Sequence, residues 1–159
     1  MQSPVGRVAE VSDPLEVLGR RHTPTSLPGV SDVEGQEETR KQFVLIVEDE
    51  ADALEAMSAW LEVEGFPSLL ARHGREALDL LRAGRRPALI LLDIRMPIMD
   101  GKEFLLQISA DRELAEIPIA VVTASAEPGD VPFRKNNAGF FLKPVDYQRL
   151  LKTVRRYCS

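Results

Sequence analysis

The chain has 159 residues, of which 44% are hydrophobic and 28% charged, with a net charge of −5. This length suits one domain with a single core and is short for two. A net acidic chain is not expected to bind nucleic acid directly, and no apolar run approaches the ~20 residues of a membrane span. The single cysteine, Cys158, excludes an internal disulfide and fits a reducing cytoplasm.

Residues 1–40 are expected to form a disordered tail. Four prolines interrupt this stretch, at Pro4, Pro14, Pro24 and Pro28. The few apolar side chains between them cannot offset the entropy cost of ordering the backbone. An alternative applies to residues 12–19, where the cap, proline and glycine pattern of a short helix predicts a transient element that a partner captures.

From residue 41 onward, apolar runs alternate with amphipathic stretches. Strands are predicted over residues 43–47, 66–71, 88–92, 117–123 and 138–142. Helices are predicted over residues 51–64, 75–83 and 102–110, and a last helix begins after a capping Asp146. The uninterrupted apolar run at 88–92 is typical of a strand buried on both faces of a parallel sheet. Residues 41–159 are therefore predicted to form one α/β domain, a doubly wound five-stranded parallel sheet.

Five helices are expected in all, and the fourth should be short or distorted. Pro128, Gly129 and Pro132 stand where this helix would begin, and a proline inside a helix costs ~3 kcal/mol. The helix should therefore start near Pro132, with Phe133 as its apolar anchor, and be mobile.

Polar side chains stand where four of the predicted strands end. They are Glu48 and Asp49, Asp93, Thr123, and Lys143. Ligand sites in open parallel sheets lie beyond the carboxyl ends of the strands, so these side chains should converge. A divalent cation relieves the repulsion among three carboxylates, and an all-oxygen ligand set suits Mg²⁺. A carboxylate beside Mg²⁺ can attack phosphorus, while an ammonium and a hydroxyl bind the phosphoryl oxygens.

Each of these residues also has an ordinary structural explanation. The acidic run from Glu48 precedes a helix N-terminus, which attracts negative charge. Asp93 could cap a loop, Thr123 suits a strand, and Lys143 could be a solvated charge. However, residues of these types follow successive strands in one order and at compatible spacings. Taken together, they favour a functional site over separate structural roles.

Four blocks resemble the signature blocks of bacterial response-regulator receiver domains. They are VLIVEDE at 44–50, LLDIRMPIMDG at 91–101, VVTA at 121–124 and FFLKP at 140–144. The resemblance runs from residue 42 to the end and implies a flavodoxin-like strand order of 2-1-3-4-5. It implies a stand-alone cytoplasmic receiver, because no output domain follows the last predicted helix. Asp93 would accept a phosphoryl group from a sensor histidine kinase or a histidine phosphotransfer protein.

The resemblance also implies a ligand set for Mg²⁺. Asp49, Asp93 and the backbone carbonyl of Arg95 would bind the ion directly, and Glu48 would act through water. Lys143 would contact the phosphoryl group.

Further roles concern switching and loop shape. Thr123 and Phe140 would form the switch, in which an aromatic ring fills the space that the threonine hydroxyl vacates. Many relatives carry tyrosine at the second position, and Phe140 lacks its hydroxyl, which predicts weaker coupling. Pro97 and Gly101 would shape the loop after the phosphoacceptor, and Pro144 would follow a cis peptide bond.

A basic surface is expected on the fourth and fifth helices. It comprises Arg134, Lys135, Arg149, Lys152, Arg155 and Arg156. The simplest explanation is a set of solvated charges, partly favoured at helix C-termini. The alternative is an output face that binds an acidic downstream protein.

Two other functions compete with this interpretation. One is a receiver-like scaffold that works without phosphorylation. The other is a phosphatase of the haloacid-dehalogenase type, which needs a second acid where this chain has Arg95. An enzyme acting on an external substrate is not expected, beyond autophosphorylation from small donors and autodephosphorylation. His22 and His73 are also considered as phosphohistidines. His22 lies in the predicted tail and His73 in a predicted loop, so both are better explained as ordinary surface histidines.

Overall fold

The fold is known from a computed structural model, which describes residues 42–124, 127, 129, 131, 132 and 134–159. The predicted tail over residues 1–40, with its possible short helix at 12–19, lies outside the described residues.

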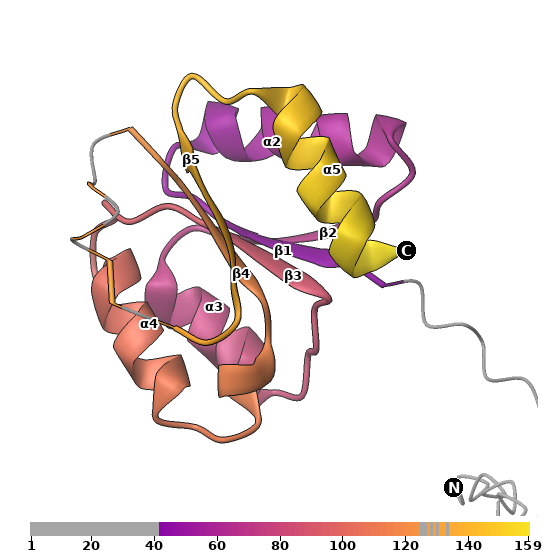
Figure 1. The fold of residues 1–159 in the computed structure, drawn as a ribbon. Helices are drawn as coiled ribbons and strands as arrows, with labels where there is room; N and C mark the ends of the chain where they lie inside the picture. Colours follow the sequence, from indigo (N-terminus) through magenta and orange to yellow (C-terminus); the bar gives the residue numbers. More distant parts are fainter. Residues whose placement is uncertain (1–41, 125–126, 128, 130, 133) are drawn as a thin grey trace, which may run out of the picture. The chain divides into compact units, whose positions relative to one another are not determined.

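Five parallel strands form one sheet in the order β2-β1-β3-β4-β5 (Figure 1). The strands are β1 (Val44–Val47), β2 (Ser68–Ala71), β3 (Leu89–Leu92), β4 (Ile119–Thr123) and β5 (Asn137–Leu142). The helices are α2 (Ala51–Val63), α3 (Gly74–Arg82), α4 (Gly101–Ser109), the 3-10 helix η1 (Leu114–Glu116) and α5 (Tyr147–Cys158). The predicted doubly wound sheet and its strand order are confirmed.

The core divides into two layers because side chains alternate across each buried strand. Leu45 and Val47 of β1 pack into the layer on the side of α3 and α4. Val44 and Ile46 pack into the opposite layer, with the buried faces of α2 and α5. Figure 1 shows the two pairs of helices on opposite faces of the sheet. Every residue of β3 is buried, as its unbroken apolar run predicts.

Helix boundaries follow local signals in the sequence. The Asp146 side chain accepts a hydrogen bond from the Arg149 N–H at 3.1 Å and caps α5 as predicted. Gly65 and Gly84 follow α2 and α3 with φ angles of 88° and 96°. Left-handed residues of this kind end helices at low cost when they are glycines.

The prediction of a helix between β4 and β5 is wrong for the part of this segment that the structure describes. Residues 124, 127, 129, 131, 132 and 134–136 contain no α-helix, so four α-helices rather than five are described. Two prolines and a glycine in ten residues remove hydrogen-bond donors and favour turns. Phe133, the expected anchor, lies outside the described residues.

Arg134 corrects a second expectation, since it does not belong to an exposed basic face. Its side chain is buried, and Nη2 donates to the carbonyls of Ala115 at 2.8 Å and Ile117 at 3.3 Å. Burial lowers the pKa of Arg134, and the nearby charge of Glu116 offsets part of this effect. Because residues 134–136 are not helical, the Arg134 side chain turns inward, and its two hydrogen bonds attach these residues to the chain at η1.

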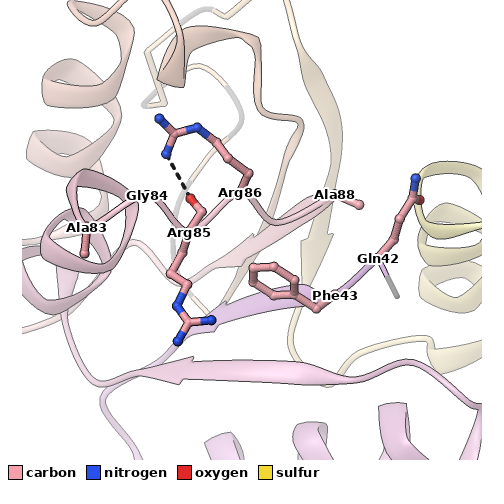
Figure 2. Close-up of a pocket in the computed structure, with 7 residues that line it drawn as sticks. All are labelled: Gln42, Phe43, Ala83, Gly84, Arg85, Arg86 and Ala88. Atoms are coloured by element: carbon pink, nitrogen blue, oxygen red, sulfur yellow. Dashed lines mark hydrogen bonds between the residues drawn. The ribbon is translucent and has the colours of Figure 1, made fainter. Parts of the chain in front are cut away.

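A hollow of about 910 Å³ lies near the amino ends of β1 and β3 (Figure 2). Its lining consists of Gln42, Phe43, Ala83, Gly84, Arg85, Arg86 and Ala88. The guanidinium of Arg86 is already bonded to the Leu81 carbonyl at 2.7 Å and to Glu113 at 3.0 Å. None of the predicted site residues lines this hollow. Within the described part of the chain, no helix combines the length and apolar character of a membrane crossing.

Candidate functional site

Three carboxylates converge where β1 and β3 end. These strands pair in register up to Val47 and Leu92, so the residues that follow each strand emerge side by side. Glu48, Asp49 and Asp93 place carboxylate oxygens within 4.8 Å of one another. Glu48 and Asp93 are buried and Asp49 is exposed. Parallel pairing thus brings together residues that are far apart in the sequence.

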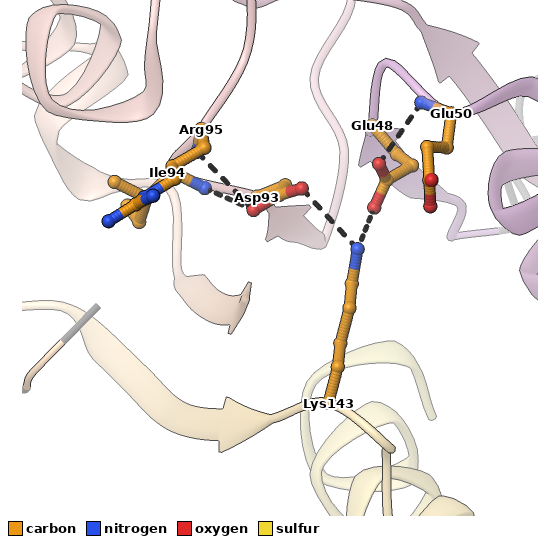
Figure 3. A network of polar contacts seen from close by, with 6 residues as sticks. All are labelled: Glu48, Glu50, Asp93, Ile94, Arg95 and Lys143. Atoms are coloured by element: carbon orange, nitrogen blue, oxygen red, sulfur yellow. Dashed lines mark hydrogen bonds and ion pairs between the residues drawn. The ribbon is translucent and has the colours of Figure 1, made fainter. Parts of the chain in front are cut away.

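Lys143 reaches this cluster from the end of β5 (Figure 3). Its ammonium forms an ion pair with Glu48 and lies 3.3 Å from Oδ2 of Asp93. The Lys143 backbone N–H donates to the Thr123 carbonyl at 3.0 Å, which fixes the base of the side chain beside β4. The peptide bond to Pro144 is cis, as the resemblance implies. The predicted lysine and carboxylates therefore share one site.

The pKa values of this cluster show how its charges balance. Burial raises the pKa of Glu48, and Asp93 adds repulsion, while hydrogen bonds from Lys143 and the Glu50 N–H act in the opposite direction. For Lys143, burial lowers the pKa, but the contacts with Glu48 and Asp93 outweigh it, so the pKa is raised. Glu48 is the more buried of the two partners. Desolvation therefore dominates the pKa of Glu48, whereas the ion pairs dominate the pKa of Lys143. Lys143 is the cation that balances the cluster.

The two oxygens of Asp93 have different surroundings. Oδ1 accepts hydrogen bonds from the backbone N–H groups of Ile94 at 2.7 Å and Arg95 at 3.4 Å. Oδ2 faces Lys143. One oxygen is thus held by the backbone of its own loop, and the other points into the site, where it can act as a nucleophile.

Thr123 ends β4 with its side chain buried at 1% exposure. Its Oγ1 has no hydrogen-bond partner among the described residues. Val121 of β4 pairs with Phe140 of β5, so these two side chains point to the same face of the sheet. Thr123 lies two residues after Val121, and because side chains alternate along a strand, Thr123 points to that face as well. Phe140 is partly buried against the layer that contains α3 and α4. The two predicted switch residues are therefore neighbours on one face.

A family model, the response regulator receiver domain, matches residues 44–155. The chain belongs to this family. It is 35% identical over 116 residues to the polar-differentiation response regulator DivK of Brucella anthropi, covering 72% of this chain and 94% of the relative. It is 34% identical to DivK of Brucella ovis, with the same coverage.

Solved structures agree with this assignment. A response regulator receiver protein from Pseudomonas putida superposes with a TM-score of 0.64 at 28% identity, covering 73% of this chain and 97% of that one. The response regulator protein TrrA from Thermotoga maritima, in complex with Mg(2+)-BeF, gives 0.64 at 26% identity, covering 73% and 98%.

The donor set of this receiver domain fits Mg²⁺. The clustered carboxylates supply oxygen ligands only, which is what Mg²⁺ prefers. Burial raises the pKa of Glu48 and the nearby charge of Asp93 adds to that rise, so a divalent cation between the carboxylates would favour their ionised forms. Asp49 and Asp93 are the residues that would hold the ion, with the Arg95 carbonyl as the proposed backbone ligand.

Gly101 allows helix α4 to start directly against the phosphoacceptor strand. A Cβ at this position would lie 2.5 Å from the Asp93 carbonyl oxygen and 2.7 Å from Cα of Ile94. The Gly101 N–H donates to the Ile94 carbonyl at 2.8 Å. Both contacts are with backbone atoms, which cannot move aside like a flexible side chain. The predicted loop role of Gly101 therefore has a steric basis.

Three features of the site were not predicted. Glu48, expected to act on Mg²⁺ through water, also forms an ion pair with Lys143. Gly74, the first residue of α3, donates its N–H to the Met99 carbonyl at 3.0 Å and so joins α3 to the loop after Asp93. Ile98 in that loop has a φ angle of 69°. No sequence signal points to this last feature, because isoleucine disfavours such a backbone.

Proposed function

We propose that this receiver domain accepts a phosphoryl group on Asp93 from a histidine kinase or a histidine phosphotransfer protein, and that it signals through protein–protein contacts. The observation that carries the proposal is the arrangement around Asp93. One carboxylate oxygen is held by the backbone, and the other faces Lys143 inside a cluster of three carboxylates.

In the proposed reaction, Oδ2 of Asp93 attacks the phosphorus of a phosphohistidine. The new O–P bond forms as the P–N bond breaks, and the electron pair of that bond stays on the imidazole nitrogen of the donor. Lys143 and the Thr123 hydroxyl bind the phosphoryl oxygens and stabilise their charge. Bound Mg²⁺ would supply further neutralisation of that charge. Attack of water on phosphorus later breaks the O–P bond, restores the Asp93 carboxylate and releases inorganic phosphate, with no external substrate turned over.

Switching would begin at Thr123. Its buried hydroxyl has no partner among the described residues, so a phosphoryl oxygen would supply the hydrogen bond that it lacks. Rotation of the hydroxyl toward the phosphoryl group would leave space on the sheet face that it shares with Phe140. Inward movement of Phe140 would fill that space, by steric fit alone because its ring carries no hydroxyl.

The proposed output face lies on α5 and the edge strand β5. Arg149, Lys152 and Arg156 are exposed on α5, while Arg155 is paired with Glu64 at 3.5 Å. This positive surface suits an acidic protein target in the cytoplasm.

The metal requirement provides the first test of this function. We expect wild-type protein to incorporate phosphate from acetyl phosphate only with Mg²⁺, into a bond that hydroxylamine cleaves. Asp49→Asn should raise the Mg²⁺ concentration for half-maximal incorporation at least about tenfold, because it removes a charged ligand. Glu50→Gln is the matched control, since Glu50 is the next acidic residue and lies outside the cluster. Equal Mg²⁺ dependence of the two variants would contradict the proposed ligand set.

A further inference from the structure

Helices α2 and α5 carry opposite charges on the surface that they expose. The charged residues of α2 are all acidic and all exposed: Asp52, Glu55 and Glu62. The charged residues of α5 are all basic and all exposed: Arg149, Lys152, Arg155 and Arg156. Both helices pack on the same face of the sheet (Figure 1). This face of the domain therefore presents an acidic helix beside a basic one.

The two helices adjoin, yet most of their charges do not pair with each other. The ring of Tyr147, the first residue of α5, packs edge-on against the ring of Trp60 of α2, with centroids 4.8 Å apart. Arg155 forms an ion pair at 3.5 Å with Glu64, which follows α2. Among the residues that the structure describes, the three acids of α2 and the other three bases of α5 form no ion pair. Their charges face solvent and are available to a partner.

Apolar side chains lie within the same surface. Val63, the last residue of α2, is 85% exposed, and Tyr147 is 42% exposed. Ala56 and Ala59 are exposed as well, and their spacing places them on the same side of α2 as Val63. Protein interfaces combine apolar contacts with a polar rim that stays accessible to solvent. A partner that fits this surface must offer apolar side chains together with complementary charges.

We propose that this partner is a second copy of the chain, with α2 of each copy packed against α5 of the other. An acidic helix beside a basic one makes the surface complementary to itself, because a two-fold rotation places each helix opposite one of the other kind. The acidic protein that suits the proposed output face on α5 is then the second copy, and the inference rests on that proposed face. Self-association covers the face and excludes another target from it.

The first test follows the mass of the wild-type full chain by sedimentation equilibrium. It uses protein concentrations up to about 0.5 mM, where a dimer with a millimolar Kd is populated. We expect dimers at low salt and a Kd that rises at least about tenfold between about 0.05 and about 0.5 M NaCl, because salt screens exposed charges. Monomers at low salt would overturn the proposal, and they are the result expected if the surface serves a different acidic protein. A Kd that did not change with salt would also overturn it.

The second test reverses charges on each helix in turn. One variant combines Glu55→Lys with Glu62→Lys on α2, and the other combines Lys152→Glu with Arg156→Glu on α5. Each variant alone should associate at least about tenfold more weakly than the wild type, because like charges then lie opposite each other. An equimolar mixture of the two should recover dimers, since the reversed helices complement each other. Undiminished association of either variant alone, or no recovery in the mixture, would refute the pairing of α2 with α5.

Arg75→Glu combined with Arg82→Glu is the matched control. Both arginines are exposed on α3, which covers the opposite face of the sheet, and the change in net charge equals that of the α5 variant. The control should associate like the wild type, and an equal loss of association would show that net charge rather than α5 is responsible. If a reversal variant fails to fold, the salt series on the wild type still decides. Incorporation of phosphate from acetyl phosphate tests the proposed phosphoacceptor function separately, because sedimentation uses no phosphoryl donor.

Discussion

Replacing Lys143 with methionine is expected to lower the free energy of unfolding by about 2–3 kcal/mol at neutral pH. The substitution keeps the apolar stem but removes the cation that balances Glu48 and Asp93, two buried carboxylates. The same variant should be phosphorylated at least about a hundredfold more slowly, since it lacks the charge that stabilises the transferring phosphoryl group. Urea denaturation and a phosphorylation time course measure the two effects.

The loss of stability in Lys143→Met should depend on pH in a defined direction. In the wild type, the raised pKa of Lys143 means that its pairing stabilises the fold fully below about pH 10.5 and less as the pH rises through the folded-state value. The raised pKa of Glu48 means that its ionisation costs stability, and that this cost disappears as the pH falls toward 4.5. Removing Lys143 leaves Glu48 without its ion-pair partner, so the deficit of the variant should shrink between pH 7 and about pH 4.5.

Lys152→Met serves as the matched control for this prediction. Lys152 is exposed on α5, where a single solvated charge contributes within about 0.5 kcal/mol. A deficit in Lys143→Met no larger than that of Lys152→Met, or one that did not change with pH, would show that Lys143 does not balance the buried carboxylates.

Thr123→Val is expected to change stability and phosphorylation in opposite directions. Valine has nearly the same shape, and it removes a buried hydroxyl that has no partner among the described residues. The free energy of unfolding should therefore rise by about 1 kcal/mol or more. The hydroxyl is also the proposed ligand of a phosphoryl oxygen, so phosphorylation by acetyl phosphate should slow by about tenfold.

Thr123→Ser isolates the role of the hydroxyl. Serine keeps it and loses a buried methyl group, so stability should fall by about 1 kcal/mol while the phosphorylation rate stays near that of the wild type. If Thr123→Val were phosphorylated as fast as Thr123→Ser, the hydroxyl would have no part in binding the phosphoryl group.

The residues of the site could be predicted because they depend on topology. Alternating strands and helices require parallel strands, and parallel strands bring their carboxyl ends to one edge. Glu48, Asp93 and Lys143 each follow an apolar strand that the sequence shows clearly, so their convergence follows from the order of the elements.

The features that could not be predicted depend on local packing. The prolines after Thr123 indicate an interrupted helix, but not that Arg134 turns inward to the carbonyls near η1. Because arginine is usually exposed, its residue type predicts that Arg134 points to solvent, whereas the side chain is buried. The positive φ of Ile98 runs against the preference of its own side chain, so its residue type does not predict it.

The central claim is that Asp93 accepts a phosphoryl group, and intact-mass spectrometry tests it most directly. Wild-type protein and Asp93→Asn would be incubated with acetyl phosphate, with and without Mg²⁺. The account predicts a gain of about 80 Da, one phosphoryl group, in the wild type with Mg²⁺ and no gain in the other three samples. A gain of the same size in Asp93→Asn would contradict it, because the phosphoryl group would then reside on another residue.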